Sequence, residues 1–125
     1  MNKALIEIGK SFSHAWDGLL TAFRDERSFR ILVAATLVVC IAITVLPLES
    51  WERILLLMVT ATMLVLELVN SMVERLVDLV KPRLHSYVKE IKDLMAAAVL
   101  VAAAFAAVIG ALILAPYVHI VLGRV

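Results

Sequence analysis

Four polar side chains recur at helical spacing within an apolar part of the 125-residue chain. The steps are three, four and four residues, from Glu67 to Asn70, Glu74 and Asp78. At ~3.6 residues per helical turn, these side chains fall on one narrow face of a helix, here called the polar stripe. Carboxylates can hold Mg²⁺ and can accept a proton from a hydroxyl, and phosphoryl transfer uses both properties. The polar stripe therefore indicates phosphoryl transfer as one candidate chemistry.

The sequence around the polar stripe is apolar enough for a membrane protein. Hydrophobic residues make up 63% of the chain, compared with about 45–50% in soluble domains. Residues 31–48 and 94–123 contain no Asp, Glu, Lys or Arg, and residues 54–73 contain only Glu67. A spanning helix needs about 20 mainly apolar residues, and a charge at the bilayer centre costs roughly 2.5–3.5 kcal/mol. A charge kept at that cost indicates a function for Glu67.

The predicted architecture is an all-α integral membrane protein with a single domain over residues 1–125. An amphipathic helix on the membrane surface is expected at residues 1–28, because apolar residues recur there at steps of three and four. An alternative for this segment is a cytosolic helix packed on a partner. The predicted transmembrane helices cover residues 30–48, 52–80 and 92–121.

The basic residues predict the orientation of these helices. They are concentrated before the first predicted span and between the second and third spans. By the positive-inside rule, both segments face the cytoplasm. Glu26, Glu74 and Lys92 then lie near the cytoplasmic face, whereas Glu67 lies deeper in the bilayer. This arrangement suits the transfer of a phosphoryl group from a soluble donor to a hydroxyl that stays in the membrane.

Two other interpretations of the polar stripe remain open. The stripe can supply interhelical hydrogen bonds in a non-catalytic scaffold, where such contacts average well under ~2 kcal/mol. Alternatively, a small proton-coupled transporter can use Glu67 to exchange a proton for a cation. The third predicted span is rich in alanine, which favours close helix packing. A homo-oligomer would supply an interior in which Glu67 is shielded from lipid.

Three blocks of the sequence resemble one known family. The residues at 67–78 match the pattern E-x-x-N-x-x-x-E-x-x-x-D, and Lys92 and Asp93 precede three alanines at 96–98. The segments W-D-G-L at 16–19 and E-R-S-F-R at 26–30 match the N-terminal part of the same family. These blocks are similar to those of the small prokaryotic membrane lipid kinases, the diacylglycerol kinase and undecaprenol kinase family. Departures from the better-known diacylglycerol kinases occur at Glu7, Ala15 and Ile31-Leu32.

The resemblance implies a lipid kinase of the bacterial inner membrane with its active site on the cytoplasmic side. Such an enzyme transfers the γ-phosphate of Mg-ATP to the hydroxyl of diacylglycerol or undecaprenol. The products are phosphatidic acid or undecaprenyl phosphate. The family forms homotrimers with composite active sites, so the implied partners are ATP, the lipid alcohol, the bilayer and two further copies of the chain. No nucleic-acid partner is expected.

The resemblance also implies roles for individual residues. Glu67 is the implied general base on the lipid hydroxyl, and it stands with Asn70 and Asp93 in the implied catalytic group. Glu26 and Glu74 are the implied ligands of the Mg²⁺ that ATP carries. The residues implied to bind or to lie near the nucleotide or substrate also include Lys10, His14, Arg83, His85 and Lys92, together with Asp93.

Overall fold

The computed structural model describes residues 3–80 and 85–123, and nearly all of these residues are helical. The all-α prediction is therefore confirmed for the part of the chain that the structure describes. The helices in chain order are α1 (Lys3–Asp25), α2 (Arg27–Val45), α3 (Ser50–Val80) and α4 (His85–Leu122).

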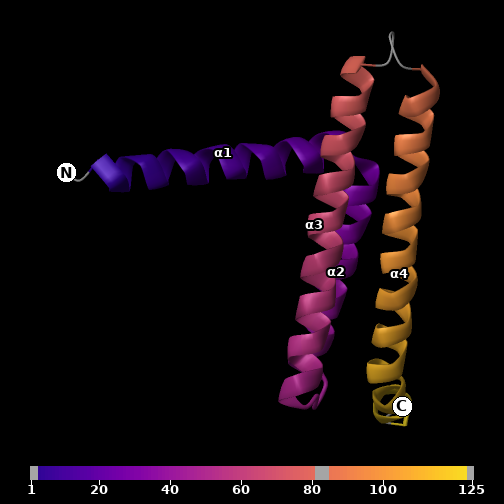
Figure 1. Cartoon of the computed structure of the whole chain (residues 1–125). Helices are drawn as coiled ribbons and strands as arrows, with labels where there is room; N and C mark the ends of the chain where they lie inside the picture. The colour runs from indigo at the N-terminus through magenta and orange to yellow at the C-terminus, as the bar shows by residue number, and fades with distance from the viewer. Residues whose placement is uncertain (1–2, 81–84, 124–125) are drawn as a thin grey trace.

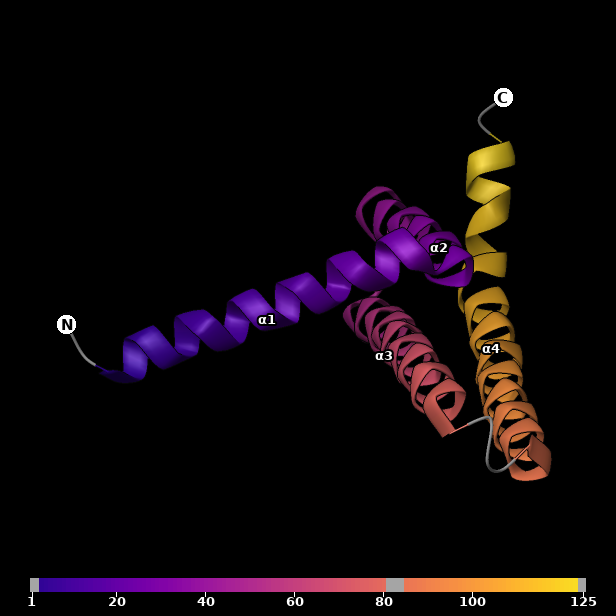
Figure 2. The same ribbon diagram turned by 90° about the horizontal axis from the view of Figure 1, so that it is seen from above.

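Helices α2, α3 and α4 form a bundle from which α1 projects sideways (Figure 1). Helix α3 packs against α4 and against α2, and α1 contacts α2 near their junction. The view from above shows α1 leading away from the other three helices (Figure 2). The N-terminal half of α1 therefore lies away from the rest of its own chain.

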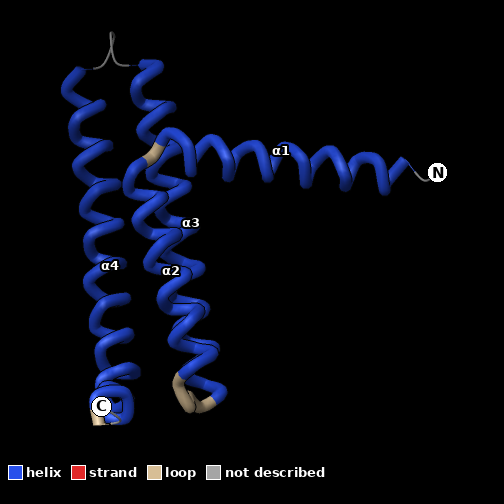
Figure 3. Tube along the Cα trace, turned by 180° about the vertical axis from the view of Figure 1, so that it is seen from behind, coloured by secondary structure: helices blue, strands red, loops and turns tan. Residues whose placement is uncertain are grey.

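The two ends of the bundle carry different connections. The α1–α2 junction lies toward the end at which α3 finishes and α4 begins, and both helices extend beyond this junction (Figures 1 and 3). We call this the link end. The short connection from α2 to α3 and the last turns of α4 lie at the opposite end, the turn end. The α1–α2 junction and the start of α4, which are far apart in the sequence, thus lie toward the same end of the bundle, the link end.

Within the described residues, three helices are long and apolar enough to cross a membrane, over Arg27–Val45, Ser50–Leu79 and Ser86–Ile120. They correspond to the three predicted spans. Helix α4 begins seven residues earlier than the predicted span, at His85 rather than residue 92. The reason is that residues 85–91 are mostly polar or charged, so hydropathy detects the apolar part of the helix and not its start. The helix also continues through Pro116 to Leu122.

The chain buries few of its side chains. Its accessible surface is 9524 Å², whereas a compact soluble protein of 13.8 kDa exposes about 6,600 Å². Large apolar side chains on all four helices are exposed, among them Phe12 and Trp16 on α1 and Phe105 on α4. These outer faces are therefore open to lipid or to further chains.

A small core and a hydrogen-bonded carboxylate hold the turn end together. Leu48, Leu56 and Ile113 form a buried cluster there. The Glu52 side chain is buried beside them, and its Oε2 accepts hydrogen bonds from the Tyr117 hydroxyl at 2.6 Å and from the Glu49 backbone N–H at 2.8 Å. A buried carboxylate with two donors is compensated for the water it has lost. Glu52 thereby ties the start of α3 to the end of α4.

Candidate functional site

The polar stripe lies on α3 and runs from the link end into the bundle. Glu74 is seven residues from Glu67, which is roughly 10 Å along the helix axis. The Glu67 side chain is only 6% exposed, and among the described residues it makes no hydrogen bond with a neighbour. It is a buried carboxylate whose oxygens are not committed to another group of the described chain.

Asn70 and Glu74 form a contact within the polar stripe. The Asn70 Nδ2 donates a hydrogen bond to Glu74 Oε1 at 3.4 Å, one helical turn along α3. Both side chains are half-buried. The bond is long and therefore weak. It holds one oxygen of Glu74 toward Asn70, and the described residues offer no hydrogen bond to its second oxygen, Oε2.

A second contact joins α3 to α4 at the link end. The Lys92 Nζ donates to Asp78 Oδ1 at 2.8 Å, and both side chains are partly exposed. Asp93 follows on α4 and is exposed. The structure thus brings Lys92 to the shallow end of the polar stripe, as the predicted topology requires.

Glu26 lies at the corner between α1 and α2. It is the single non-helical residue between these helices, with φ −104° and ψ 115°, and its side chain makes no cap hydrogen bond to α2. The Arg75 guanidinium of α3 contacts both Asp25 Oδ2 at 3.0 Å and Glu26 Oε1 at 3.4 Å. The corner that carries Glu26 is therefore attached to the same helix as Glu74.

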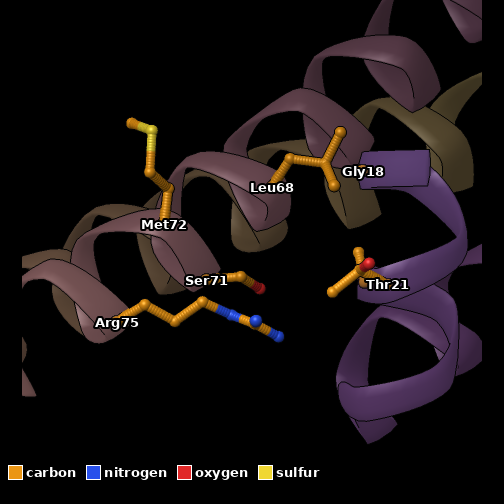
Figure 4. A pocket seen from close by; sticks show the side chains of 7 residues that line it. Gly18, Thr21, Leu68, Ser71, Met72 and Arg75 are labelled. Atoms are coloured by element: carbon orange, nitrogen blue, oxygen red, sulfur yellow. The ribbon is translucent and has the colours of Figure 1, made fainter. Parts of the chain in front are cut away.

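A groove of about 280 Å³ separates α1 from α3 beside this corner (Figure 4). The Arg75 side chain extends from α3 beside Ser71, and its guanidinium points toward α1. Ser71 is buried and belongs to the same helical face as Glu67. The residues that line the groove are Gly18, Thr21, Ala22, Leu68, Ser71, Met72 and Arg75.

Two predicted site residues on α1 lie far from this group within one chain. Lys10 is 15 residues before Asp25, or roughly 22 Å along the helix, and His14 is 11 residues before it, or roughly 16 Å. Both are exposed and lie in the part of α1 that projects from the bundle. Two others cannot be located: Arg83 lies outside the described residues, and of His85 only the backbone, at the start of α4, is described.

The two candidate metal ligands at the link end have the chemistry that a magnesium ion takes. Glu26 and Glu74 supply carboxylate oxygens, which are the ligands that Mg²⁺ prefers. Each carboxylate has one oxygen in a contact longer than 3.3 Å and one without a hydrogen bond to the described residues. Within the described residues, no group of three or more His, Cys, Asp or Glu gathers at one point. A magnesium ion held by these two carboxylates would take its remaining ligands from water or phosphate, as is usual for this ion.

Sequence reasoning missed Arg75 and Asp25 as members of this group. Arg75 directly follows Glu74, but its contacts reach back 50 residues to Asp25 and 49 to Glu26. No local pattern encodes such a pairing. The sequence offered one indication of a role for Asp25, namely that it directly precedes the candidate metal ligand Glu26.

The fold and the position of these side chains define a class of protein. The described residues form a small helical protein with three helices that could cross a membrane, and the contacts of Glu26, Glu74 and Lys92 lie toward one end of the bundle. The model of the prokaryotic diacylglycerol kinase family matches residues 13–114, which is most of the chain. The chain belongs to this family, and the resemblance inferred from its motifs is confirmed.

Individual relatives carry two different names. A diacylglycerol kinase of Synechocystis sp. is 37% identical over 107 residues, which is 85% of this chain but 61% of that protein. An undecaprenol kinase of Bacillus subtilis is 36% identical over 107 residues, covering 86% of this chain and 87% of that protein. A diacylglycerol kinase of Pseudomonas aeruginosa is 39% identical over 85 residues, covering 68% and 69%. The family and these names indicate a lipid kinase of bacterial membranes.

Proposed function

We propose that the chain transfers the γ-phosphate of Mg-ATP to the hydroxyl of a membrane lipid, either diacylglycerol or undecaprenol. The observation that carries this proposal is the polar stripe of α3. Its deep end is the buried and uncommitted Glu67, and its shallow end is Glu74 near the Glu26 corner. One helix face thus offers a carboxylate to a group within the membrane and another to a ligand arriving from water.

The proposed reaction assigns the proton to Glu67. The lipid oxygen forms a bond to the γ-phosphorus while the bond from that phosphorus to the bridging oxygen of ADP breaks. Glu67 accepts the hydroxyl proton, and the products are ADP and phosphatidic acid or undecaprenyl phosphate. The bound Mg²⁺ would neutralise phosphate charge when held by Glu26 and Glu74. Asn70 orients Glu74, and Lys92 and Asp93 bind the nucleotide.

The proposed orientation places the link end at the cytoplasmic face of the bacterial inner membrane. Helix α3 has 31 residues, or roughly 46 Å, which exceeds the ≈ 30 Å hydrocarbon core of a bilayer. Its link end therefore extends into water, where ATP is available. Helix α1 then lies along the surface, with exposed apolar side chains such as Phe12, Trp16 and Phe23 directed to lipid.

The active form is proposed to be a homotrimer with composite sites. Lys10 and His14 lie roughly 22 and 16 Å along α1 from the corner, so they serve a nucleotide bound by another copy of the chain. The exposed helix faces and the alanine-rich α4 offer surfaces for such packing. Within one copy, this distance along α1 separates Lys10 and His14 from the proposed ligands at the corner.

A lipid panel tests the proposed function. Purified protein in mixed micelles receives ATP labelled at the γ-phosphate and one lipid at a time: diacylglycerol, undecaprenol, ceramide or monoacylglycerol. We expect label in the lipid fraction with diacylglycerol or undecaprenol, and none when Mg²⁺ is chelated. Absence of label with every lipid overturns the proposal. Proton-coupled flux into sealed liposomes without ATP would favour the transporter instead.

A further inference from the structure

The Glu26 side chain lacks support from its own segment. It belongs to the one-residue break between α1 and α2, and it does not cap the helix that follows. Arg30 of α2 bonds back to the end of α1, because its Nη1 donates to the carbonyls of Phe23 at 3.2 Å and Arg24 at 2.9 Å. These bonds fix α1 relative to the start of α2. They do not fix the corner relative to α3.

Arg75 supplies the missing attachment. Among the described residues, its Nη2 makes the only side-chain hydrogen bonds between the α1–α2 corner and α3. The bond to Asp25 is shorter, at 3.0 Å, than the contact to Glu26, at 3.4 Å. Asp25 is therefore the anchor, and Glu26 keeps most of its acceptor capacity for another ligand. Arg75 is also the residue directly after Glu74.

We propose that Arg75 is a positioning residue that anchors the corner to α3 through Asp25 and so fixes Glu26 relative to Glu74. The inference rests on the proposed function, in which these two carboxylates hold Mg²⁺. Arg75 and Asp25 are about half exposed, at 51% and 49%, whereas Glu26 is 25% exposed. The pair is thus accessible at the surface, and its effect is on geometry more than on overall stability.

The role differs from direct binding of phosphate by Arg75. A phosphate-binding arginine acts through its own charge, so neutralising Asp25 would leave it functional. A positioning arginine acts mainly through its contact with Asp25, so Asp25→Asn should weaken the same property as Arg75→Ala. The effect of Asp25→Asn should not exceed that of Arg75→Ala, which also removes the longer contact to Glu26. The two variants combined should then be no worse than Arg75→Ala alone, because Arg75→Ala already removes the contact with Asp25.

The experiment measures binding of Mn-ATP to the solubilised protein by electron paramagnetic resonance, without lipid substrate. The variants are Arg75→Ala, Asp25→Asn and their combination. Arg24→Ala serves as the matched control, because its side chain is exposed on the same corner and makes no hydrogen bond to the described residues. Helicity by circular dichroism checks that each variant is folded. Kinase assays on the same proteins separate kcat from the KM for Mg-ATP.

We expect both single variants and the combination to weaken Mn-ATP binding by roughly two- to fivefold, the range an exposed ion pair can supply. The KM for Mg-ATP should rise by the same factor with little change in kcat, and Arg24→Ala should match the wild type. Binding lost in Arg75→Ala but kept in Asp25→Asn overturns positioning and assigns Arg75 to the phosphates. If the wild type is active and Arg75→Ala binds Mn-ATP equally well, this inference alone is overturned. A wild type that phosphorylates no lipid overturns the proposed function and this inference with it.

Discussion

The two ends of the bundle use acidic side chains in different ways. At the turn end, Glu52 is 8% exposed and accepts two hydrogen bonds of 2.6 and 2.8 Å. At the link end, the contacts of Glu26 and Glu74 are 3.4 Å long and occupy one oxygen each. A carboxylate whose acceptors are filled stabilises the fold. A carboxylate with open acceptors is able to take a ligand, and among the described residues of the two ends the link end offers several of these.

Glu67 is as buried as Glu52, but it has no hydrogen-bond donors like those of Glu52 among the described residues. Replacing each glutamate with glutamine is therefore the strongest test of the difference between the two ends. We expect Glu67→Gln to lower kcat by about 100-fold or more, because a general base contributes roughly 10²–10⁴-fold. Glutamine keeps the shape and removes the proton acceptor. The measurement is initial rate of lipid phosphorylation at saturating Mg-ATP, with helicity as the check on folding.

The matched control for this prediction is Glu52→Gln at the turn end. It should keep kcat and KM, since Glu52 lies at the opposite end of the bundle, and it should lower thermal stability. Wild-type turnover in Glu67→Gln would remove Glu67 from the reaction.

The next largest effect is expected for the shallow end of the polar stripe. Glu74→Ala should raise the KM for Mg-ATP by at least about tenfold, because loss of a metal-site group commonly weakens metal binding by 10–100-fold. The KM is obtained by varying Mg-ATP at fixed lipid. Glu49→Ala provides the comparison at the turn end, where the Glu49 side chain accepts only from Trp51 Nε1 among the described residues. An unchanged KM in Glu74→Ala would exclude Glu74 as a ligand.

A smaller effect is expected for the contact that closes the turn end. Tyr117→Phe removes the 2.6 Å hydrogen bond to Glu52 and leaves a buried acceptor with one donor fewer. The midpoint of thermal unfolding should fall by a few degrees, while lipid phosphorylation at 25 °C stays at the wild-type rate. Loss of activity without loss of stability would show that the two ends are coupled.

The fold could largely be predicted from the sequence, since uncharged apolar runs define the spans and Glu67 to Asp78 repeat at helical spacing. The start of α4 at His85 could not be predicted from hydropathy, because the polar first turns of this helix are no more apolar than a loop. The Arg75 contacts were also unpredictable, because they depend on the angle at which α1 leaves the bundle. The distance of Lys10 and His14 from the corner follows from their sequence separation along α1, but their distance from α3 depends on the same angle.

The register of α3 gives the proposed enzyme a dependence on bilayer thickness. Trp51 lies at the turn end, and side chains of this type prefer the membrane interface. Glu67 is 16 residues further on, or roughly 24 Å, so in a hydrocarbon core of ≈ 30 Å it lies roughly 6 Å below the opposite interface. A lipid hydroxyl would have to reach that depth to meet Glu67. The distance from Trp51 to Glu67 along α3 is fixed. Lipids that thicken or thin the bilayer should therefore change the depth of Glu67 and its access to the lipid hydroxyl.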